Sequence, residues 1–179
     1  LGNTLRVSIC STSTAFSSNL TSTSSVTANA TSVSATTVNV TGNPTANLYA
    51  GDLVSFDGGT SYIRTTAVNA SNIVLASAVT TAISVGQAIL RKWQYADEFG
   101  VAPGTSSYAT NVGGSGDECH IIVVDEDGKF TGTANTVLEK FAFVSKASDA
   151  ISDSGDTNYY KTVINSQSQY IWWLGHQPG

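Results

Sequence analysis

Charge is nearly missing from the first half of this chain. Only 12% of the 179 residues are charged, about half of the share usual in a soluble domain. No charged residue lies between Val7 and Gly51, so hydroxyl and amide groups must provide most of the solvation there. The net charge of -5 arises in residues 91–179. The basic residues of that part are scattered and form no stripe. This distribution argues against direct contact with nucleic acid.

Long apolar runs, cysteine and methionine are also scarce or absent. No apolar run approaches the roughly 20 residues of a membrane-spanning helix, so we expect no membrane insertion. Cys10 and Cys119 are the only two cysteines. They form no CxxC pair, and we predict two reduced core thiols, although a bridge between them stays open. Because no initiator methionine or signal peptide is visible and the chain stops at "GHQPG", we expect an internal segment of a longer polypeptide.

The Ser/Thr-rich tract that follows residue 10 has the composition of a disordered segment. Disordered chains, however, combine high net charge with few β-branched residues, and this tract has neither property. Its alternation favours strands, with one face formed by Val26, Ala28 and Ala30 and another by Val38 and Val40. Turn residues, among them Asp57-Gly58-Gly59, divide the next block into short β-rich runs. Residues 16–93 therefore predict a small antiparallel barrel or sandwich, whose expected core is Leu53, Phe56, Ile63, Val68, Ile73, Leu75 and Ile89.

Composition changes after Trp93, where a Pro/Gly/Ser-rich connection leads to a more ordinary globular pattern. "HIIVVDE", an Asp-Gly turn and "KFTGT" predict a β-hairpin. "TVLEKFAFVSK" favours a further strand, with a helix as the alternative; a strand would place Phe141 and Phe143 on one face and Leu138, Ala142 and Val144 on the other. "GDTNYYKTVINSQSQ" predicts a helix capped by Asp156 or Thr157. "YIWWL" then predicts an extended run.

These patterns predict a β-rich α+β fold with a discontinuous core. The core domain would comprise residues 1–15 and 94–179, because "TLRVSI" near the N-terminus also reads as a strand. The Ser/Thr-rich β domain of residues 16–93 would be inserted into it, and we expect that domain to face outward.

The titratable residues form no recognisable catalytic or metal-binding pattern. Asp125, Glu126 and Asp127 beside Gly128 are rich in oxygen, but EF-hand spacing fails and Lys129 falls inside the loop, so we predict a solvated hairpin tip. His120 and His176 are isolated from any nucleophile or metal-ligand spacing. We predict that His120, at the start of a strand, is a half-buried structural residue.

Other candidate sites are equally weak. Residues 113–116, Gly-Gly-Ser-Gly, precede a strand and do not open a helix, which disfavours a phosphate cradle. Asp97 and Glu98 are only sequence neighbours, whereas glycoside chemistry needs carboxyl groups that face each other. Trp172 and Trp173 would point to opposite faces of a strand. Glycosylation sequons begin at Asn19, Asn29, Asn39 and Asn69, as chance allows in such a composition. We therefore predict no catalytic, cofactor-binding or metal-binding residues, no cofactor and no enzyme.

Four segments together resemble the tail sheath protein of contractile-tailed bacteriophages of the T-even-like and cyanophage type. They are "GNTLRVSIC" at 2–10, "FGVAPGTSSYA" at 99–109, "DECHIIVVDEDGKFTGTANTVLEKFAFVSKASDA" at 117–150 and "TNYYKTVINSQSQYIWW" at 157–173. They cover somewhat under half of the chain. The block at 16–93 carries no such signature and is similar to the variable decoration domain that this family inserts into its core.

The resemblance implies a structural subunit that polymerises around the tail tube and contracts to drive the tube through the host envelope for genome delivery. The implied partners are further sheath subunits in a homo-oligomeric helical array, the tail tube protein, and baseplate and tail terminator proteins. The implied location is the virion, after synthesis in the host cytoplasm. Family subunits are linked by terminal arms that add strands to a neighbouring sheet. Those arms should lie outside this segment, so we expect residues 1–179 alone to be soluble and largely monomeric.

A different class of function remains open beside this one. The Ser/Thr-rich domain would then be a virion-surface or secreted β domain that binds glycans or a host receptor.

Overall fold

The chain divides into two compact units in the computed structural model, which describes residues 4–175. Unit 1 comprises Leu1–Thr12 and Val101–Gly179, and unit 2 comprises Ser13–Gly100. The structure therefore changes unit at 12/13 and 100/101, where composition led us to expect 15/16 and 93/94. The fold is β-rich, with one antiparallel sheet of three strands, another of eight strands, and few helices.

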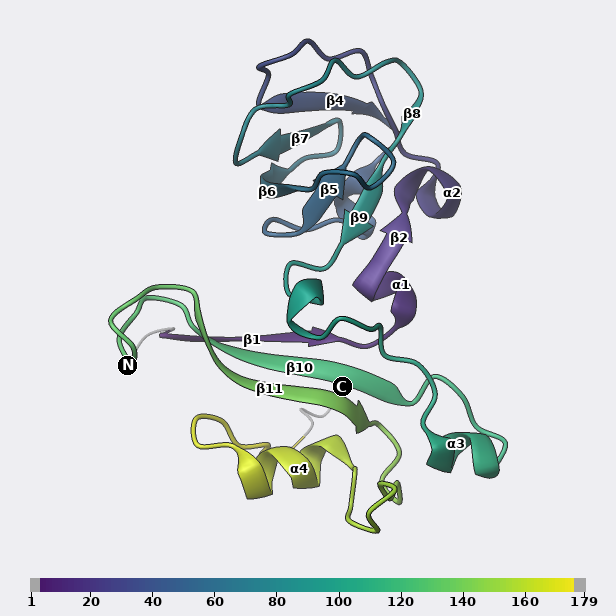
Figure 1. Ribbon diagram of the computed structural model, residues 1–179, viewed down its shortest axis with the longest axis vertical. Helices are drawn as coiled ribbons and strands as arrows, with labels where there is room; N and C mark the ends of the chain where they lie inside the picture. The colour runs from purple at the N-terminus through teal and green to yellow at the C-terminus, as the bar shows by residue number, and fades with distance from the viewer. Residues whose placement is uncertain (1–3, 176–179) are drawn as a thin grey trace. The chain divides into compact units, whose positions relative to one another are not determined.

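The sheet of unit 1 joins strands that lie before and after unit 2 in the sequence. Its strands are β1 (Leu5–Cys10), β10 (Glu118–Asp125) and β11 (Thr136–Ser145), in the order β1-β10-β11 (Figure 1). Val7 lies opposite Val123 and Ile9 opposite Ile121 in the antiparallel register of β1 and β10. The sheet is complete only when these two distant segments meet.

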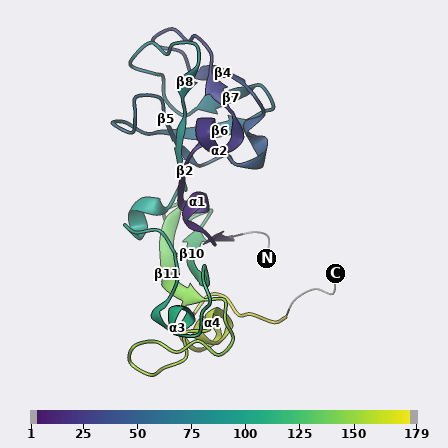
Figure 2. The same cartoon turned by 90° about the vertical axis from the view of Figure 1, so that its right-hand side faces the viewer.

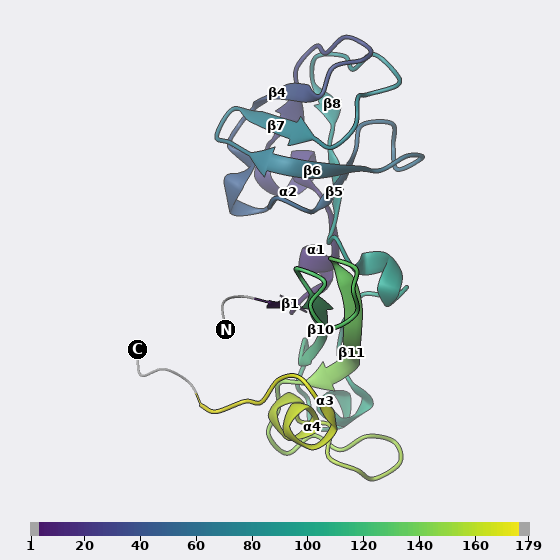
Figure 3. The ribbon, with the colours of Figure 1, turned by 90° about the vertical axis from the view of Figure 1, so that its left-hand side faces the viewer.

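One face of this sheet is covered by helix α4 (Tyr160–Gln167), which Figure 3 shows beside β11. Val163 and Ile164 of α4 are buried against the sheet. Their cluster comprises Cys119, Ile121, Val123, Phe141, Val144, Val163 and Ile164, with Leu5, Leu138, Tyr160, Tyr170 and Ile171 partly buried around it. The helix was expected, but its predicted caps are wrong. The N-cap is Tyr159, whose side chain makes no capping hydrogen bond.

Strand β11 differs from its prediction in two ways. The helical alternative is wrong, because the segment pairs with β10 along its length. The predicted faces are wrong as well, since Phe141 and Val144 enter the same core cluster. The cause is a register shift opposite Cys119 to Ile121, where Phe143 adopts a φ of 54°. Such a bulge adds a residue to one strand and inverts the alternation beyond it.

The hairpin between β10 and β11 is longer than an Asp-Gly turn. "KFTGT" is not a strand, because β10 ends at Asp125 and β11 begins only at Thr136. The Asp125 carboxylate accepts hydrogen bonds from the backbone N–H groups of Phe130 and Thr131, which a β ladder would otherwise use. At the other end of unit 1, helix α3 (Ser107–Asn111) precedes β10, and the "YIWWL" run is irregular and forms no strand.

Unit 2 contains the eight-stranded sheet, in the order β2-β9-β5-β6-β7-β4-β3-β8. Figure 3 shows β4, β7 and β6 side by side, and Figure 2 shows the same unit turned to its opposite side. Its elements are α1 (Ser13–Phe16), β2 (Ser17–Asn19), α2 (Leu20–Ser24), β3 (Thr27–Ala28), β4 (Thr37–Thr41), η1 (Pro44–Ala46), β5 (Leu53–Ser55), β6 (Ile63–Val68), β7 (Asn72–Leu75), β8 (Gln87–Ala88), β9 (Leu90–Lys92) and η2 (Ala96–Glu98).

Unit 2 encloses its own apolar core. The buried cluster comprises Leu20, Val26, Ala28, Val38, Val40, Leu48, Val54, Phe56, Ile73, Leu75, Val79, Ile83 and Ile89. The prediction that Phe56, Ile73, Leu75 and Ile89 are core residues is confirmed, and Ile63 and Val68 pack against the cluster from partly exposed positions. Leu53 is wrong, because Val54 takes the buried position on β5. Ala30, expected beside Val26 and Ala28, is exposed.

Candidate functional site

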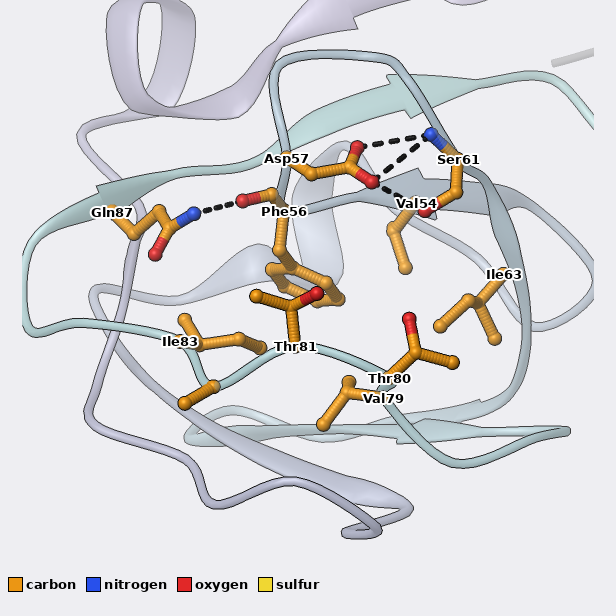
Figure 4. A pocket seen from close by; sticks show the side chains of 11 residues that line it. Val54, Phe56, Asp57, Ser61, Ile63, Val79, Thr80, Thr81, Ile83 and Gln87 are labelled. Carbon is orange, nitrogen blue, oxygen red and sulfur yellow. Dashed lines mark hydrogen bonds between the residues drawn. The ribbon is translucent and has the colours of Figure 1, made fainter.

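A small pocket opens in unit 2 between the β5–β6 loop and the segment at residues 79–83 (Figure 4). Its volume is about 40 Å³. The apolar lining comes from β5, from the residue after it, from the start of β6 and from the segment before β8, and consists of Val54, Phe56, Ile63, Val79, Ala82 and Ile83. The polar lining consists of Asp57, Ser61, Thr80, Thr81 and Gln87. The pocket thus combines an apolar floor with a few polar groups at its rim.

Asp57 organises the loop that forms one wall. Its Oδ1 accepts a hydrogen bond from Ser55 Oγ at 2.7 Å, and both carboxylate oxygens accept from the Ser61 N–H at 3.0 and 3.1 Å. Ser61 Oγ donates to Oδ2 at 2.5 Å. The hydrogen bond from Ser55, followed by those from Ser61, lowers the pKa of Asp57 far below its ordinary value. The pocket rim therefore carries a fixed negative charge.

Gln87 and two threonines complete the rim. Gln87 Nε2 donates to the carbonyl oxygen of Phe56, and its Oε1 accepts from the Ser84 N–H at 2.9 Å. This amide thus joins the two walls. Thr80 and Thr81 are exposed, and in the described part of the chain their hydroxyls have no hydrogen-bond partner. They remain available to a ligand.

The pocket volume suits a small group. A water molecule needs about 10–15 Å³ of comparable space, so about 40 Å³ admits a few waters or a methyl-sized substituent. Ser61 Oγ donates to the Asp57 carboxylate, whose strongly lowered pKa makes it a weak base. Both histidines of the chain, His120 and His176, belong to unit 1.

The acidic turn of unit 1 is not a solvated tip throughout. Asp125 is fully buried, which corrects the prediction for this residue. Its Oδ2 accepts from the Phe130 N–H at 3.0 Å and from the N–H and hydroxyl of Thr131, both at 2.8 Å. Burial raises the pKa of Asp125, but the hydrogen bonds from Thr131 and Phe130 outweigh it and the net shift is downward. Asp127 is exposed, and Glu126 is partly exposed beside Arg6 at 3.6 Å.

His120 is fully buried, where a half-buried position was predicted. Its Nε2 lies 2.8 Å from the carbonyl oxygen of Val101, and its Nδ1 accepts from the Phe143 N–H at 3.1 Å. His176 lies outside the described residues. Cys10 and Cys119 are buried thiols that are not joined by a disulfide, which confirms the two core thiols. Burial raises the pKa of Cys119 to about 11.

The remaining sequence candidates are dispersed. Residues 113–116 connect α3 to β10, and Asp97 and Glu98 lie in η2. Asn19 caps α2 through its Oδ1, Asn29 accepts from Thr41, and Asn69 donates to Asn72. Trp172 is exposed, whereas the ring of Trp173 packs on Tyr160. Among residues 4–175, no three His, Cys, Asp or Glu side chains are placed to hold a metal ion.

Sequence reasoning missed the pocket of unit 2. Asp57 was assigned only to a turn, and the segment at 79–83 carried no motif. The one available signal was Asp57 with Ser55 and Ser61, an acceptor flanked by hydroxyl donors. What places these residues opposite residues 79–83 is long-range packing, which local spacing does not encode.

The chain matches no family model, no curated protein and no solved structure. Separately, none of the helices formed by residues 4–175 has the length and apolar character needed to cross a membrane.

Proposed function

We propose that this chain is a structural part of a contractile phage tail sheath subunit, which polymerises around the tail tube and contracts to drive it through the host envelope. One observation carries the proposal: β1, β10, β11 and α4 belong to the segments that resemble sheath proteins, and all four elements pack in unit 1. Residues 13–100, most of which lack the resemblance, pack around a separate core.

The proposal includes the finer architecture. Unit 1 is the discontinuous α+β core domain of the subunit. Unit 2 is an inserted small β-barrel or sandwich that decorates the outer surface. Its near-neutral Ser/Thr-rich composition suits a solvent-facing role, because hydroxyls solvate a surface without creating a strong field.

Unit 1 offers surfaces through which copies could interact. Strand β1 pairs only with β10 among the described strands, so one of its edges is available. Val7 and Ile9 on this strand are 44% and 54% exposed. An available strand edge with apolar side chains is the kind of surface to which another chain adds a strand. A sheath needs such contacts in two alternative packings, since contraction is a rearrangement of rigid bodies.

Electron microscopy of the polypeptide with tail tubes tests the proposal. We expect a longer polypeptide that contains this chain to form helical arrays on tubes, with other sheath subunits, tube, baseplate and terminator proteins as partners in the virion. Residues 1–179 alone should remain monomeric in light scattering. Failure of the longer polypeptide to assemble on tubes, or its isolation as a single copy in an unrelated complex, would contradict the proposal.

The pocket of unit 2 favours a second candidate function, glycan binding. Its apolar floor with Phe56, beside the hydroxyls of Thr80 and Thr81, can receive a methyl group together with a hydrogen-bonding group. A pocket of about 40 Å³ fits a substituent and not a whole sugar ring. An acetamido sugar has the matching chemistry, since its methyl group suits the floor and its amide group suits the threonine hydroxyls.

Chemical-shift titration with N-acetylglucosamine, with glucose as the unsubstituted comparison, tests this second function. We expect shifts at the pocket for the acetamido sugar only, and their loss in Thr80→Val. The matched control is Thr37→Val, because Thr37 is an exposed β4 threonine outside the pocket. Equal indifference to both sugars would rule the candidate out.

A further inference from the structure

The imidazole of His120 is fixed in one neutral form by its two hydrogen bonds. Its side chain is fully buried on β10. The carbonyl of Val101, 2.8 Å from Nε2, can only accept, so Nε2 carries the proton. The Phe143 N–H, 3.1 Å from Nδ1, can only donate, so Nδ1 must offer a lone pair. A neutral imidazole meets both demands and an imidazolium ion cannot, because both of its nitrogens are donors.

The bond to Phe143 secures the irregular point of β11. Phe143 has a φ of 54°, a left-handed conformation that is costly for a bulky side chain. The bulge directs its N–H to the imidazole of His120. The two rings also meet edge to face, with centroids 4.6 Å apart. His120 therefore stabilises a conformation that the local sequence does not favour.

The residues just beyond the bulge hold the segment that leads to α4. The Phe143 carbonyl accepts from Asn158 Nδ2 at 2.9 Å, and the Ser145 N–H donates to the Asn158 carbonyl at 2.8 Å. Ser145 also forms a parallel bridge with Tyr159, the residue before α4. These bonds connect the bulge at Phe143 to residues 158 and 159.

We propose that His120 is a proton-operated latch: its neutral imidazole holds the end of β11 and residues 158–159 on the sheet, and protonation releases them. An imidazolium would turn a second N–H toward the Phe143 N–H. The repulsion removes the bond that secures the bulge. This latch is independent of whether the chain serves in a tail sheath.

The charged and titratable groups around the latch define its pH range. Glu118 and Asp117 precede His120, Cys10 faces it from β1, and Lys146 follows β11 with its Nζ bound to the Ser11 carbonyl at 3.0 Å. Burial lowers the pKa of His120, partly offset by the Val101 carbonyl and by the charge of Glu118. For Asp117, burial raises the pKa, but hydrogen bonds from Ser145 and Ser106 give a net lowering, so Asp117 stays ionised where an imidazole titrates.

The sign of the effect follows from linkage. A lowered pKa in the latched state means that the latch is fully stable above the ordinary histidine pKa of about 6.5 and weakens as pH falls below it. Opening is favoured by up to about tenfold for each pH unit below that value. The lower limit of the window is the depressed pKa of the latched state.

Amide hydrogen exchange followed by NMR tests the latch in a His176→Gln background, where His120 is the sole imidazole. We expect the protection factor of the Phe143 amide to fall by up to about tenfold between pH 7.5 and pH 5.5. The Leu75 amide, which donates to the Thr36 carbonyl at 2.8 Å in unit 2, serves as the control and should keep its protection.

Two variants separate the latch from general acid sensitivity. His120→Asn retains an acceptor near the Nδ1 position without titrating, so its Phe143 protection should not depend on pH. His120→Phe lacks the acceptor and should show low protection throughout. Unchanged wild-type protection at pH 5.5, or the same loss in His120→Asn, would overturn the proposal. If the variants do not fold, unchanged Phe143 protection at pH 5.5 in the His176→Gln protein still overturns it.

Discussion

At the scale of single residues, the most constrained electrostatic contact is the ion pair of Asp52 and Arg91 in unit 2. Their side chains are only 4% and 6% exposed, and Arg91 Nη2 lies 2.9 Å from Asp52 Oδ2. Arg91 Nε donates to the same oxygen at 3.0 Å, and Nη1 donates to the carbonyls of Thr14 and Ala15. Burial raises the pKa of Asp52 even though the charge of Arg91 lowers it. Desolvation therefore outweighs attraction, and each charge depends on its partner.

Removal of one partner should cost far more than removal of both. Arg91→Met leaves a buried carboxylate and should lower the free energy of unfolding by about 3–5 kcal/mol, whereas Asp52→Leu with Arg91→Met should restore part of that loss. The penalty of the single variant should shrink as pH falls, because the raised pKa lets Asp52 become neutral. Urea denaturation measures the free energy of unfolding of the single variant and of the double variant, and the pH dependence of the single variant's loss.

The exposed pair of Lys92 and Asp97 provides the control. Its atoms lie 3.7 Å apart with side-chain exposures of 33% and 80%, so Asp97→Asn should cost less than about 1 kcal/mol. Equal losses in the free energy of unfolding from Arg91→Met and Asp97→Asn would show that burial does not determine how much the Asp52–Arg91 pair matters for stability.

Residue-level prediction from the sequence succeeded where alternation was regular and failed where the backbone departs from it. Val38, Val40 and Ile73 are buried as strand patterns indicate. The prediction placed Leu53 in the core where the structure has Val54, and such a one-residue error inverts the faces of a strand. The burial of Asp125 and His120 depends on donors that lie several residues away or on another strand, so neither spacing nor composition could reveal it.

At the scale of elements, α4 shows what a short helix needs in order to persist. Helices much shorter than about 12 residues are unstable alone, and α4 spans Tyr160–Gln167 with no capping side chain at its start. Packing replaces the missing cap: Val163 and Ile164 are 6% and 4% exposed. Glu139 on β11 also accepts from Ser168 Oγ at 2.5 Å and from the Gln169 N–H at 2.7 Å.

Truncation of the buried face of α4 should therefore be costly. Ile164→Ala should destabilise the protein by about 2–5 kcal/mol, through lost apolar burial and a residual cavity. Thr162→Ala on the exposed face of the same helix should change stability by less than about 0.5 kcal/mol. Thermal and urea unfolding of both variants provides the measurement. A loss for Ile164→Ala no larger than that for Thr162→Ala would mean that α4 is not anchored by packing.

The existence and type of long elements could be predicted, but their ends and irregularities could not. The apolar runs of β10 and β11 and the helical spacing near residue 163 identified three elements of unit 1. The bulge at Phe143 and the long loop after Asp125 depend on hydrogen bonds to His120 and Asp125. Such tertiary bonds override local propensity, because a satisfied buried donor outweighs a small conformational preference.

At the scale of the whole molecule, the change in composition along the chain indicated two parts, and the structure shows two units with their own cores. Composition could not predict the sequence boundaries between the units. Residues near the ends of unit 2 belong to it because of their contacts and not because of their residue type. Trp93, for example, packs with Tyr95 and Phe99, with ring centroids 5.4 and 5.5 Å away. These three aromatic residues place residues 94–100 in unit 2.

Unit 2 should fold when residues 13–100 are expressed alone. Its buried cluster lies wholly within that range, and β2 pairs with β9 through Ser17 opposite Lys92 and Asn19 opposite Leu90, so the two ends of the fragment are joined by backbone hydrogen bonds. A chain whose ends meet in its own sheet loses little stability when the flanking residues are removed.

We expect a dispersed amide spectrum and one cooperative urea transition for the fragment 13–100. Residues 24–100, which lack β2 and Leu20, are the matched truncation and should unfold at lower urea. A disordered fragment 13–100 would show that unit 2 depends on unit 1. Equal stability of the two fragments would show that the pairing of β2 with β9 does not hold unit 2 together.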